Sequence, residues 1–316
     1  MLRPLTIVLL ITVLWLSACT EPPEDVVRIG IHVWPGYDTL ILARDKNLLA
    51  DANVRLIELP SASESIRAFQ NRTVDGALLT VDEVLRLADH GHDPVIILVM
   101  DFSNGADAVL AQPQIDSLAA LKGKTIGVEP NALGAYVLAR ALDTANLSSS
   151  DVTLVSMPIA ETTAAFTDRQ VDAVVTYEPH RTHILDAGAK LLFDSTQMPG
   201  EIMDVLVVHR EVIERSPKAL QRLVDAQFSA LEYLAKQSDE AVTLMANREN
   251  ITPAELRASL TRLELPDRQG NQQLLSVKDT TLPDTIRRLI TLMREQKMLD
   301  SDLSEREFRN DRFVRD

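Results

Sequence analysis

Four aromatic side chains lie in or beside loops that follow short apolar runs, although aromatic residues make up only 4% of this 316-residue chain. They are Trp34, Tyr37, Tyr136 and Tyr177. Such rings stack on planar molecules and attract cations to their faces. A single ring at the end of an apolar run would be expected only to cap a core. Four rings in such places favour a box that holds a planar or cationic ligand.

Acidic residues dominate the same loops, in which Arg181 is the one cation. A dedicated nitrate or sulfonate site would favour a fork of lysine or arginine. The acids therefore predict a cationic amine or an amino-heterocycle, with Glu178 accepting hydrogen bonds from its N–H groups. For Asp82 and Glu83 the alternative role is that of a solvated cap or a salt-bridge partner. The acids of these loops and of the later apolar run are Asp38, Asp82, Glu83, Asp101, Asp107, Glu178 and Asp204.

Two segments that enter predicted helices offer a different chemistry. Ser61 and Ser63 lie in the first, and Asn131 and Gly134 lie in the second. Free N–H groups at a helix N-terminus attract anions, so both segments could seat a sulfonate, a carboxylate or the acidic end of a zwitterion. The serines and Asn131 could equally be ordinary N-caps. Both roles stay open, because a cap and a ligand can share one helix end.

We expect no catalytic residues, metal site or cofactor. His90 and His92, and likewise His180 and His183, have spacings that suit a metal, but no further ligand cluster accompanies them. Surface or capping histidines are therefore the preferred interpretation. The sequence also has no Ser–His–Asp order, nucleophile elbow or P-loop. These features favour a binding protein over an enzyme.

The elements that would position the loops come from an internal repeat with a spacing of 96 to 98 residues. In each half, three short apolar runs alternate with helical patterns, which predicts a βαβαβ unit with a parallel sheet. Ligands bind outside the carboxyl ends of such strands, where the loops described above lie. Four islands recur in the same order: 28–31 as 125–128, 42–44 as 138–140, 54–60 as 152–158, and 69–75 as 166–172.

The two units predict an α/β fold of two lobes, each a mostly parallel sheet flanked by helices. An apolar run at residues 95–100 lies between the halves, and a second run at 204–209 follows them. We interpret these runs as the paired crossings between the lobes. The prediction is a discontinuous first lobe, residues 26–105 with 203–316, and an inserted second lobe, residues 106–202.

The tail after the second crossing has a helical pattern. Ser216 and Pro217 are typical of a helix start, and an amphipathic stripe follows them. A second helix is predicted at about residues 282–298. Because the inserted half has no counterpart to this tail, we expect the tail to pack on the first lobe.

The first residues are typical of an export signal. Arg3 precedes a nearly unbroken apolar run at residues 5–16, which is too short for a transmembrane span and fits a secretory signal. The Leu-Ser-Ala-Cys segment that ends at Cys19 resembles the lipobox of bacterial lipoproteins. This resemblance implies a signal peptide at residues 1–18, a lipid on Cys19 and a polar tether at 19–25. The alternative is a plain signal peptide with an incidental cysteine.

Charge and cysteine content exclude several classes of protein. With 32 Lys and Arg against 46 Asp and Glu, the formal charge is −14, which argues against a nucleic-acid partner. A single cysteine excludes a disulfide framework and any zinc or iron–sulfur site built on cysteines. A hydrophobic share of 46% is ordinary for a globular protein and argues against wholesale disorder.

Three motifs resemble ABC-importer substrate-binding proteins of the type II periplasmic fold, in the branch for nitrate, sulfonates, taurine and thiamine-pyrimidine precursors. They are Trp34-Pro35-Gly36-Tyr37, Val74-Asp75-Gly76-Ala77, and residues 172–179. The resemblance implies a monomeric, lipid-anchored periplasmic receptor that binds a small solute by hinge closure and delivers it to a permease and its ATPase. A sensor module that serves a membrane kinase is the alternative. Yeast-type pyrimidine synthases resemble the same fold but carry a Cys-rich iron motif, which this chain lacks.

The predicted ligand is a small, planar, nitrogen-bearing solute, neutral or cationic. We expect Trp34, Tyr37 and Tyr177 to hold it and Glu178 to accept its hydrogen bonds. An anionic solute of the sulfonate or nitrate type remains the alternative, because the branch binds anions, aminosulfonates and heterocycles alike. The full set of predicted ligand-binding residues is Trp34, Tyr37, Ser61, Ser63, Asp82, Asp107, Asn131, Gly134, Tyr136, Tyr177, Glu178 and Asp204.

Overall fold

The computed structural model describes residues 25–130 and 132–315. The predicted signal peptide, Cys19, most of the tether and Asn131 lie outside the described residues, so the predictions made for them are not addressed by the fold. Within the described ranges, no helix combines the length and the apolar character that a membrane crossing requires.

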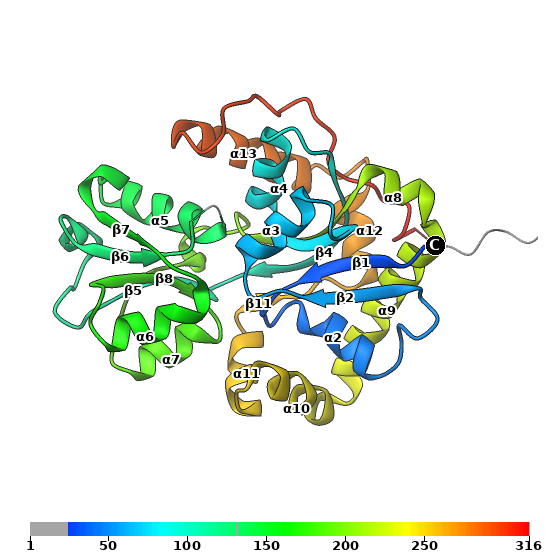
Figure 1. The fold of residues 1–316 in the computed structure, drawn as a ribbon, viewed down its shortest axis with the longest axis horizontal. Coiled ribbons are helices and arrows are strands. Elements are labelled where there is room, and N and C mark those ends of the chain that lie inside the picture. Colours follow the sequence, from blue (N-terminus) through cyan, green and yellow to red (C-terminus); the bar gives the residue numbers. More distant parts are fainter. Residues whose placement is uncertain (1–24, 131, 316) are drawn as a thin grey trace, which may run out of the picture.

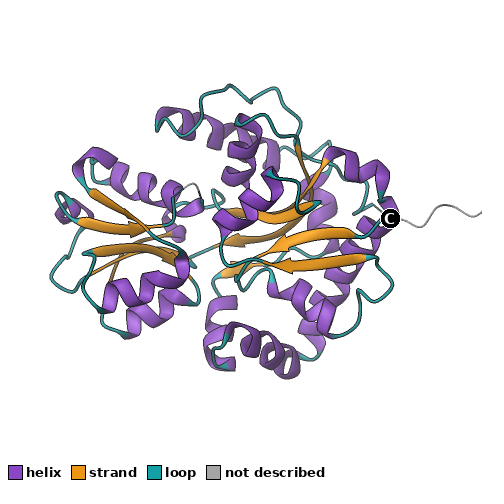
Figure 2. Cartoon of the chain, viewed as in Figure 1, coloured by secondary structure: helices purple, strands orange, loops and turns teal. Residues whose placement is uncertain are grey.

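Two sheets, each covered by helices, divide the molecule into two lobes (Figures 1 and 2). The predicted two-lobe α/β architecture is therefore confirmed. The larger sheet has the order β11-β4-β10-β3-β1-β2, and the smaller one has the order β7-β6-β8-β5-β9. The strands are β1 (Val27–Ile31), β2 (Val54–Glu58), β3 (Gly76–Thr80), β4 (Pro94–Ser103), β5 (Asp107–Ala111), β6 (Thr125–Val128), β7 (Thr153–Ser156), β8 (Ala173–Tyr177), β9 (Lys190–Asp194), β10 (Met203–His209) and β11 (Leu263–Glu264).

The sequence repeat corresponds to one structural unit that occurs in both lobes. β1 pairs in parallel with β2 and β3, and β6 pairs in parallel with β7 and β8. The carboxylates of Asp75 and Asp172 each accept a hydrogen bond of 2.9 Å, from the backbone N–H of Arg28 and of Thr125 respectively. These equivalent aspartates explain why the Val-Asp pair recurs in the sequence. Each one ties the start of its third strand to the first strand.

The sheets are mixed, which differs from the mostly parallel sheets that the sequence predicts. β10 runs antiparallel to β3 and β4, and β5 runs antiparallel to β8 and β9. These antiparallel strands adjoin the crossings, which are residues 104–106 between β4 and β5 and residues 195–202 between β9 and β10. The runs at 95–100 and 204–209, interpreted from the sequence as the crossings, are instead parts of β4 and β10 within the larger sheet. A strand that enters a lobe from its neighbour begins at the edge where the parallel strands end, so it runs in the opposite direction.

Helices follow the strands of each parallel unit and begin at the edge that faces the other lobe. α3 starts after Ser61, whose hydroxyl oxygen accepts a hydrogen bond from the Glu64 N–H at 3.3 Å. In α4, the Glu83 carboxylate accepts the N–H of Thr80 at 3.0 Å. Such caps fix where these helices begin. The helices are α2 (Asp38–Asp45), α3 (Ala62–Gln70), α4 (Val81–Asp89), α5 (Leu133–Thr144), α6 (Thr162–Thr167) and α7 (His180–Asp186).

The C-terminal tail packs on the first lobe, as predicted. α9 packs against α2 and β2, α13 packs against α4, and α12 packs against β4. The Asn271 side chain accepts the N–H of Val99 at 2.8 Å and donates to the Val99 carbonyl at 3.0 Å. The helix predicted at 282–298 is α13. The tail helices are α8 (Arg210–Arg215), α9 (Pro217–Lys236), α10 (Ser238–Glu249), α11 (Pro253–Leu260), α12 (Arg268–Leu275) and α13 (Thr281–Glu295).

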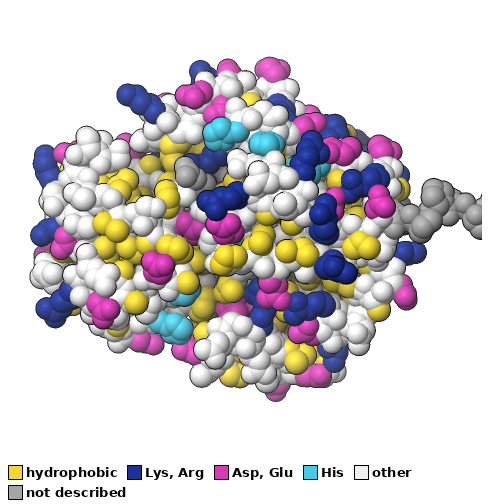
Figure 3. Space-filling model, in the orientation of Figure 1, with side chains coloured by type: hydrophobic (Ala, Val, Ile, Leu, Met, Phe, Trp, Pro, Cys, Tyr) yellow, Lys and Arg dark blue, Asp and Glu magenta, His cyan; other side chains and the backbone are white. Residues whose placement is uncertain are grey.

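Charged side chains of both signs are interspersed over the visible face of the described residues (Figure 3). The acidic and basic groups also form many exposed pairs, such as Arg210 with Asp93 and Lys236 with Glu232. Exposed pairs of this kind contribute little to the stability of a fold. The electrostatics that bear on function are therefore those of the buried groups between the lobes.

Candidate functional site

A cavity lies between the two lobes, at the carboxyl ends of the parallel strands. The centre of a water-sized sphere can reach about 30 Å³ of it, and all the space between its atoms, open solvent included, is about 520 Å³. The first lobe contributes the segment after β1, the start of α3, the junction of β3 with α4 and the start of β10. The second lobe contributes residues of β5, β8 and α5 and of the segments that follow β6 and β7. The lining residues are His32, Trp34, Tyr37, Ala62, Thr80, Glu83, Asp107, Glu129, Ala132, Leu133, Gly134, Val137, Ile159, Val175, Thr176, Tyr177 and Asp204.

Three of the four predicted aromatic residues line this cavity, and their rings contact one another. Trp34 of the first lobe and Tyr177 of the second meet edge to face, with ring centroids 5.6 Å apart at 85°. Trp34 and Tyr37 are 6.5 Å apart at 65°. This edge-to-face arrangement differs from the open sandwich that the sequence suggests. The rings form an apolar wall that joins the two lobes.

Gly36 allows the tryptophan wall to form. The Trp34 Nε1–H donates to Asp101 Oδ2 at 3.0 Å. A Cβ atom at position 36 would lie 1.9 Å from that oxygen and 2.7 Å from the Trp34 nitrogen. Only glycine leaves room for this buried hydrogen bond, so the Trp-Pro-Gly-Tyr motif has a steric reason as well as an aromatic one.

Two aspartates reach the cavity from opposite lobes with unpaired oxygens. Tyr37 donates its hydroxyl proton to Asp204 Oδ1. Asp204 Oδ2 and Asp107 Oδ2 are buried and have no hydrogen-bond partner among the residues that the structure describes. The Tyr177 hydroxyl is in the same position. Buried polar atoms without partners are rare in folded proteins, and the two carboxyl oxygens point to a group that would donate to them, whereas the hydroxyl could donate or accept.

The two helix N-termini at the cavity receive carboxylates that come from the opposite lobe. Glu83 of the first lobe accepts the N–H of Leu133, at the start of α5, at 3.0 Å. Glu129 of the second lobe accepts the N–H of Ser63, at the start of α3, at 3.0 Å. The second oxygen of Glu129 has no partner among the described residues. The anion-seating role predicted for these helix ends is therefore taken by side chains of the protein itself.

His32 adds a neutral acceptor to the cavity wall. The Ser65 hydroxyl donates its proton to the Ser61 carbonyl at 3.2 Å, so His32 Nδ1 must donate to Ser65 Oγ at 3.3 Å. Burial lowers the pKa of His32 to about 3, and the charge of Arg248 adds to this effect. The ring is thus neutral at physiological pH, and its Nε2 is left as an acceptor.

Burial raises the pKa of several carboxyl groups at the cavity. The pKa of Glu83 rises to about 8, with the charge of Asp82 as a second cause, and that of Asp107 rises to about 7. Burial also raises the pKa of Asp101 to about 7. For Asp204 burial and then the charge of Asp101 raise the pKa well above its usual range. Ionising these groups together is unfavourable unless positive charge enters the cavity.

Several residues predicted to bind a ligand lie outside the cavity lining. Ser61 caps α3, and the Ser63 hydroxyl donates to the Pro130 carbonyl at 3.1 Å. Asp82 accepts the Thr80 hydroxyl proton at 2.7 Å. Tyr136 donates to Glu201 at 2.6 Å, on the side of α5 that faces the second crossing. These groups support the walls of the cavity, whereas Gly134 lines it as predicted.

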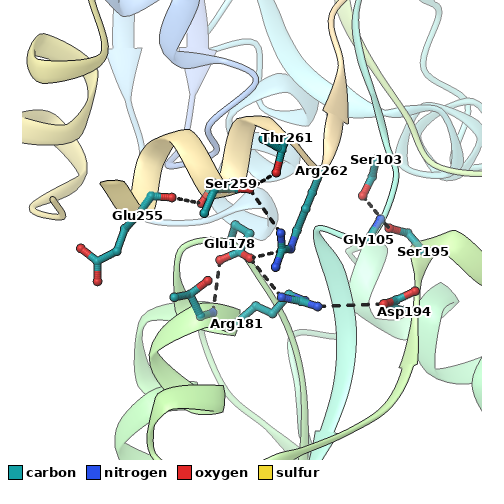
Figure 4. A network of polar contacts seen from close by, with 12 residues as sticks. Ser103, Gly105, Glu178, Arg181, Asp194, Ser195, Glu255, Ser259, Thr261 and Arg262 are labelled. Atoms are coloured by element: carbon teal, nitrogen blue, oxygen red, sulfur yellow. Dashed lines mark hydrogen bonds and ion pairs between the residues drawn. The ribbon is translucent and has the colours of Figure 1, made fainter. Parts of the chain in front are cut away.

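Glu178 lies outside the cavity lining too, in a network that links the lobes (Figure 4). Its fully buried carboxylate lies 3.3 Å from an Arg181 nitrogen and 3.4 Å from Arg262 Nε. It also accepts the Thr182 N–H at 3.2 Å. Arg262 belongs to the first lobe, between α11 and β11. The carboxylate predicted to meet a ligand is thus already engaged by two guanidinium groups.

Several residues of the cavity were not expected from the sequence. They are His32, Thr80, Glu129 and Thr176, whereas Glu83 was counted among the acids of the loops, with a role as a solvated cap or salt-bridge partner as the alternative. Glu129 follows β6 directly, so the strand-end rule already contained its signal. His32 gave no signal of its own, because the sequence does not tell which way a side chain points after a strand.

Metal binding has no support within the described ranges, where no group of three or more His, Cys, Asp or Glu side chains is arranged to hold an ion. His90 and His92 lie at the end of α4, as the interpretation of capping histidines requires. His180 begins α7 and contacts the Thr163 hydroxyl at 3.3 Å.

Comparison with known proteins places the fold and the family. A putative binding protein of Brucella abortus is 26% identical over 171 residues, which are 51% of this chain and 53% of that protein, so the match spans about half the length of that relative. A putative aliphatic sulfonates-binding protein of Escherichia coli is 24% identical over 259 residues, 79% of each chain.

Solved structures share the fold at low sequence identity. The alkanesulfonate-binding protein SsuA from Xanthomonas axonopodis, bound to MOPS, has a TM-score of 0.72 and 19% identity, over 90% of this chain and 96% of that chain. The desulfurization enzyme DSZB has a TM-score of 0.66 and 15% identity, over 91% and 97% of the two chains. A family model described as the NMT1-like family matches residues 20–248, well over half of the chain, and the protein therefore belongs to the NMT1-like family.

Proposed function

We propose that this protein is the solute-binding component of an ABC import system, a receptor rather than an enzyme. It would take a small solute into the cavity between its lobes and present it to a membrane permease. The family match, the fold shared with SsuA and a cavity lined by both lobes support this role. Two short crossings allow the lobes to close by a hinge motion.

The ligand we propose is a compact cation with several N–H donors, such as an amidinium, a guanidinium or a protonated amine. The observation that carries this proposal is the balance of donors and acceptors at the cavity. Among the described lining residues, no lysine or arginine is present. Apart from the Tyr177 hydroxyl, which has no partner among the described residues, the side chains that can donate hydrogen bonds use their protons within the protein, and the carboxyl oxygens remain as acceptors.

The lining donors can be followed one by one. The protons of Trp34 Nε1 and of the Tyr37 hydroxyl go to Asp101 and Asp204. Thr80 donates to Asp82 at 2.7 Å. Thr176 lies 3.4 Å from Thr162 Oγ1, whose own proton goes to the Ile159 carbonyl, so Thr176 is the donor. Trp34, Tyr37, Thr80 and Thr176 thus each donate to a partner within the protein. The Nδ1–H of His32 does so too, since it donates to Ser65 Oγ.

The acceptors at the cavity are strong and unpaired. Asp107 Oδ2, Asp204 Oδ2 and Glu129 Oε2 each lack a partner among the described residues. A sulfonate or nitrate offers only acceptors, so it could not donate to these oxygens and would be repelled by those carboxyl groups that are ionised. A cation with N–H groups would satisfy them and favour their ionised forms. The aromatic wall of Trp34 and Tyr177 adds favourable contact with a planar cation.

An anionic solute is the second candidate. It is favoured by the ligand classes named for two similar proteins, which are alkanesulfonates for SsuA and aliphatic sulfonates for the Escherichia coli protein. Such a solute would have to displace Glu83 and Glu129 from the two helix N-termini. Those carboxylates would then lose the N–H groups that stabilise them, which makes this candidate the weaker one.

A ligand screen tests the proposal. Thermal shift and isothermal titration calorimetry would compare benzamidine, methylguanidine and putrescine with taurine, methanesulfonate and nitrate. We expect shifts with members of the first group and a loss of binding in Asp107→Asn. Binding of nitrate or methanesulfonate alone would contradict the cationic ligand and favour the second candidate.

We further propose a periplasmic location with a lipid on Cys19. The family match begins at residue 20, directly after that cysteine. Processing that is blocked by globomycin and abolished by Cys19→Ala would support the anchor, and processing insensitive to both would contradict it. The partner is proposed as a permease with its ATPase, and a neighbouring sensor-kinase gene in place of importer genes would favour the sensory alternative.

A further inference from the structure

We infer that Glu83 and Glu129 are specificity-determining residues that keep acidic solutes out of the cavity. Each is a carboxyl group of one lobe that occupies a helix N-terminus of the other lobe, where an anionic solute would otherwise bind. The inference deepens the proposed function, on which it rests for the cavity being the solute site. The observation behind it is a reciprocal pair of contacts across the lobes.

The contacts are reciprocal in direction and similar in length. The Glu83 carboxylate of the first lobe meets the Leu133 N–H of α5 at 3.0 Å. The Glu129 carboxylate of the second lobe meets the Ser63 N–H of α3 at 3.0 Å. The N-terminus of a helix carries partial positive charge and free N–H groups, so these are the two places where an anion would be held best.

Neither contact is ordinary capping within one element. α3 has its own cap, since Ser61 already accepts the Glu64 N–H, and Glu129 takes a different N–H of the same turn. The residue before α5 is Ala132, which has no side-chain acceptor. Glu83 therefore serves as the acceptor for α5 although it lies 50 residues earlier, on α4.

Glu83 disfavours an anion by occupying the N–H at the start of α5, and Glu129 also does so by its buried charge. Both glutamates line the cavity, with exposed fractions of 1% for Glu83 and 6% for Glu129. The second oxygen of Glu129 has no partner among the described residues, so its negative charge is not balanced within the described part of the wall. A sulfonate or nitrate would meet this charge in a place of low dielectric constant, where repulsion between like charges is strong.

The remaining charged and titratable groups at the cavity also offer no positive charge to an anion. Asp107 and Asp204 line it, His32 is neutral, and Tyr37 and Tyr177 carry no charge because burial raises the pKa of each well above the usual range. The wall therefore places carboxyl groups of the protein at the two helix ends that suit an anion, with further acids around them.

The test removes the two charges while keeping the shape of the side chains. The variants are Glu129→Gln alone and Glu83→Gln with Glu129→Gln, and the probes are methanesulfonate and nitrate in calorimetric titrations. Asp82→Asn is the matched control, because it removes a buried carboxylate beside Glu83 that lies outside the cavity lining. Glu129→Gln alone leaves the α4 cap made by Glu83 intact, so it provides a variant that should fold even if the double variant does not.

We expect the double variant to bind methanesulfonate at least about tenfold more tightly than the wild type, because unfavourable like-charge contacts are removed. The single variant should show a smaller gain and Asp82→Asn none. Folded variants with no gain in anion affinity, an equal gain in Asp82→Asn, or tight anion binding by the wild type would each overturn the inference. Benzamidine titrations run in parallel distinguish a failure of the proposed ligand from a failure of this inference. A wild type that binds no benzamidine would contradict the cationic ligand, whereas the anion titrations would still test the role of Glu83 and Glu129.

Discussion

Replacing Asp107 by asparagine should change how the stability of the protein depends on pH. Asp107 is 2% exposed, its Oδ2 has no partner among the described residues, and burial raises its pKa from 3.8 to about 7. In the folded protein the carboxyl group therefore keeps its proton between about pH 4 and pH 7, where the unfolded chain has lost it. The free energy of unfolding consequently falls as the pH rises through this window.

The size of this fall follows from the shift. One proton contributes about 1.4 kcal/mol per pH unit, so Asp107 accounts for a loss of about 4 kcal/mol between pH 4 and pH 8. The side chain of Asp107→Asn does not titrate, so the variant lacks this pH-dependent fall in the free energy of unfolding. The new amide adds a pH-independent penalty of about 1–3 kcal/mol if it is left without partners. That penalty cancels when the pH 4 and pH 8 values of each protein are subtracted.

Urea unfolding of the wild type and of Asp107→Asn at pH 4 and pH 8, followed by circular dichroism, measures the difference. We expect the variant to gain about 4 kcal/mol relative to the wild type on going from pH 4 to pH 8. Asp116→Asn, an exposed change in the same lobe, is the control and should leave the pH dependence unchanged. If the two pH profiles of wild type and Asp107→Asn were parallel within 1 kcal/mol, the account of a strained, buried carboxylate would be refuted.

Three further outcomes follow from the same contacts. Tyr37→Phe removes the hydroxyl that donates to the buried carboxylate of Asp204, so urea unfolding should show a loss of about 1–3 kcal/mol, and an unchanged midpoint would contradict this. Glu178→Gln should lower the free energy of unfolding by roughly 3 kcal/mol, because it leaves Arg181 buried without its main partner, and should affect benzamidine affinity less than Asp107→Asn does. Benzamidine affinity should rise through pH 7 with release of protons, seen as a buffer-dependent heat in calorimetry, because Asp107 must lose its proton to pair with a cation; a flat profile from pH 5.5 to 8 would contradict it.

The fold could be predicted from the sequence because the patterns that specify its strands and helices are periodic and occur twice along the chain. The equivalence of Asp75 and Asp172 appears in the sequence as a recurring Val-Asp pair and in the structure as the same hydrogen bond. The position of the cavity followed from the rule that parallel strands bind ligands at their carboxyl ends, which brought Trp34, Tyr37 and Tyr177 together. Short-range patterns and one general rule of topology were sufficient for this.

The partners of individual charges could not be predicted in the same way. Glu178 contacts Arg262, which lies 84 positions further along the chain in a helical tail without a repeat. Glu83 contacts the N–H of Leu133 only because the two lobes meet. Sequence spacing reports neighbours along a helix or strand, whereas these pairs depend on how the two lobes are placed. Among the proposed ligand acceptors, Glu129 therefore takes the place of Glu178, beside Asp107 and Asp204 of the predicted set.

Some interactions between the lobes favour closure and others oppose it, so a ligand can shift the balance between them. Edge-to-face contact of Trp34 with Tyr177, and the two carboxylate–helix contacts, favour closure. The charge of Asp101 on the first lobe raises the pKa of Asp204, and that of Asp107 on the second lobe raises the pKa of both, so ionisation of these groups opposes closure. A ligand shifts such an equilibrium only by its differential affinity for the two forms. A cation placed among carboxylates of both lobes would bind the closed form more tightly than the open form. The arrangement of carboxylates that surrounds it exists only when the lobes meet.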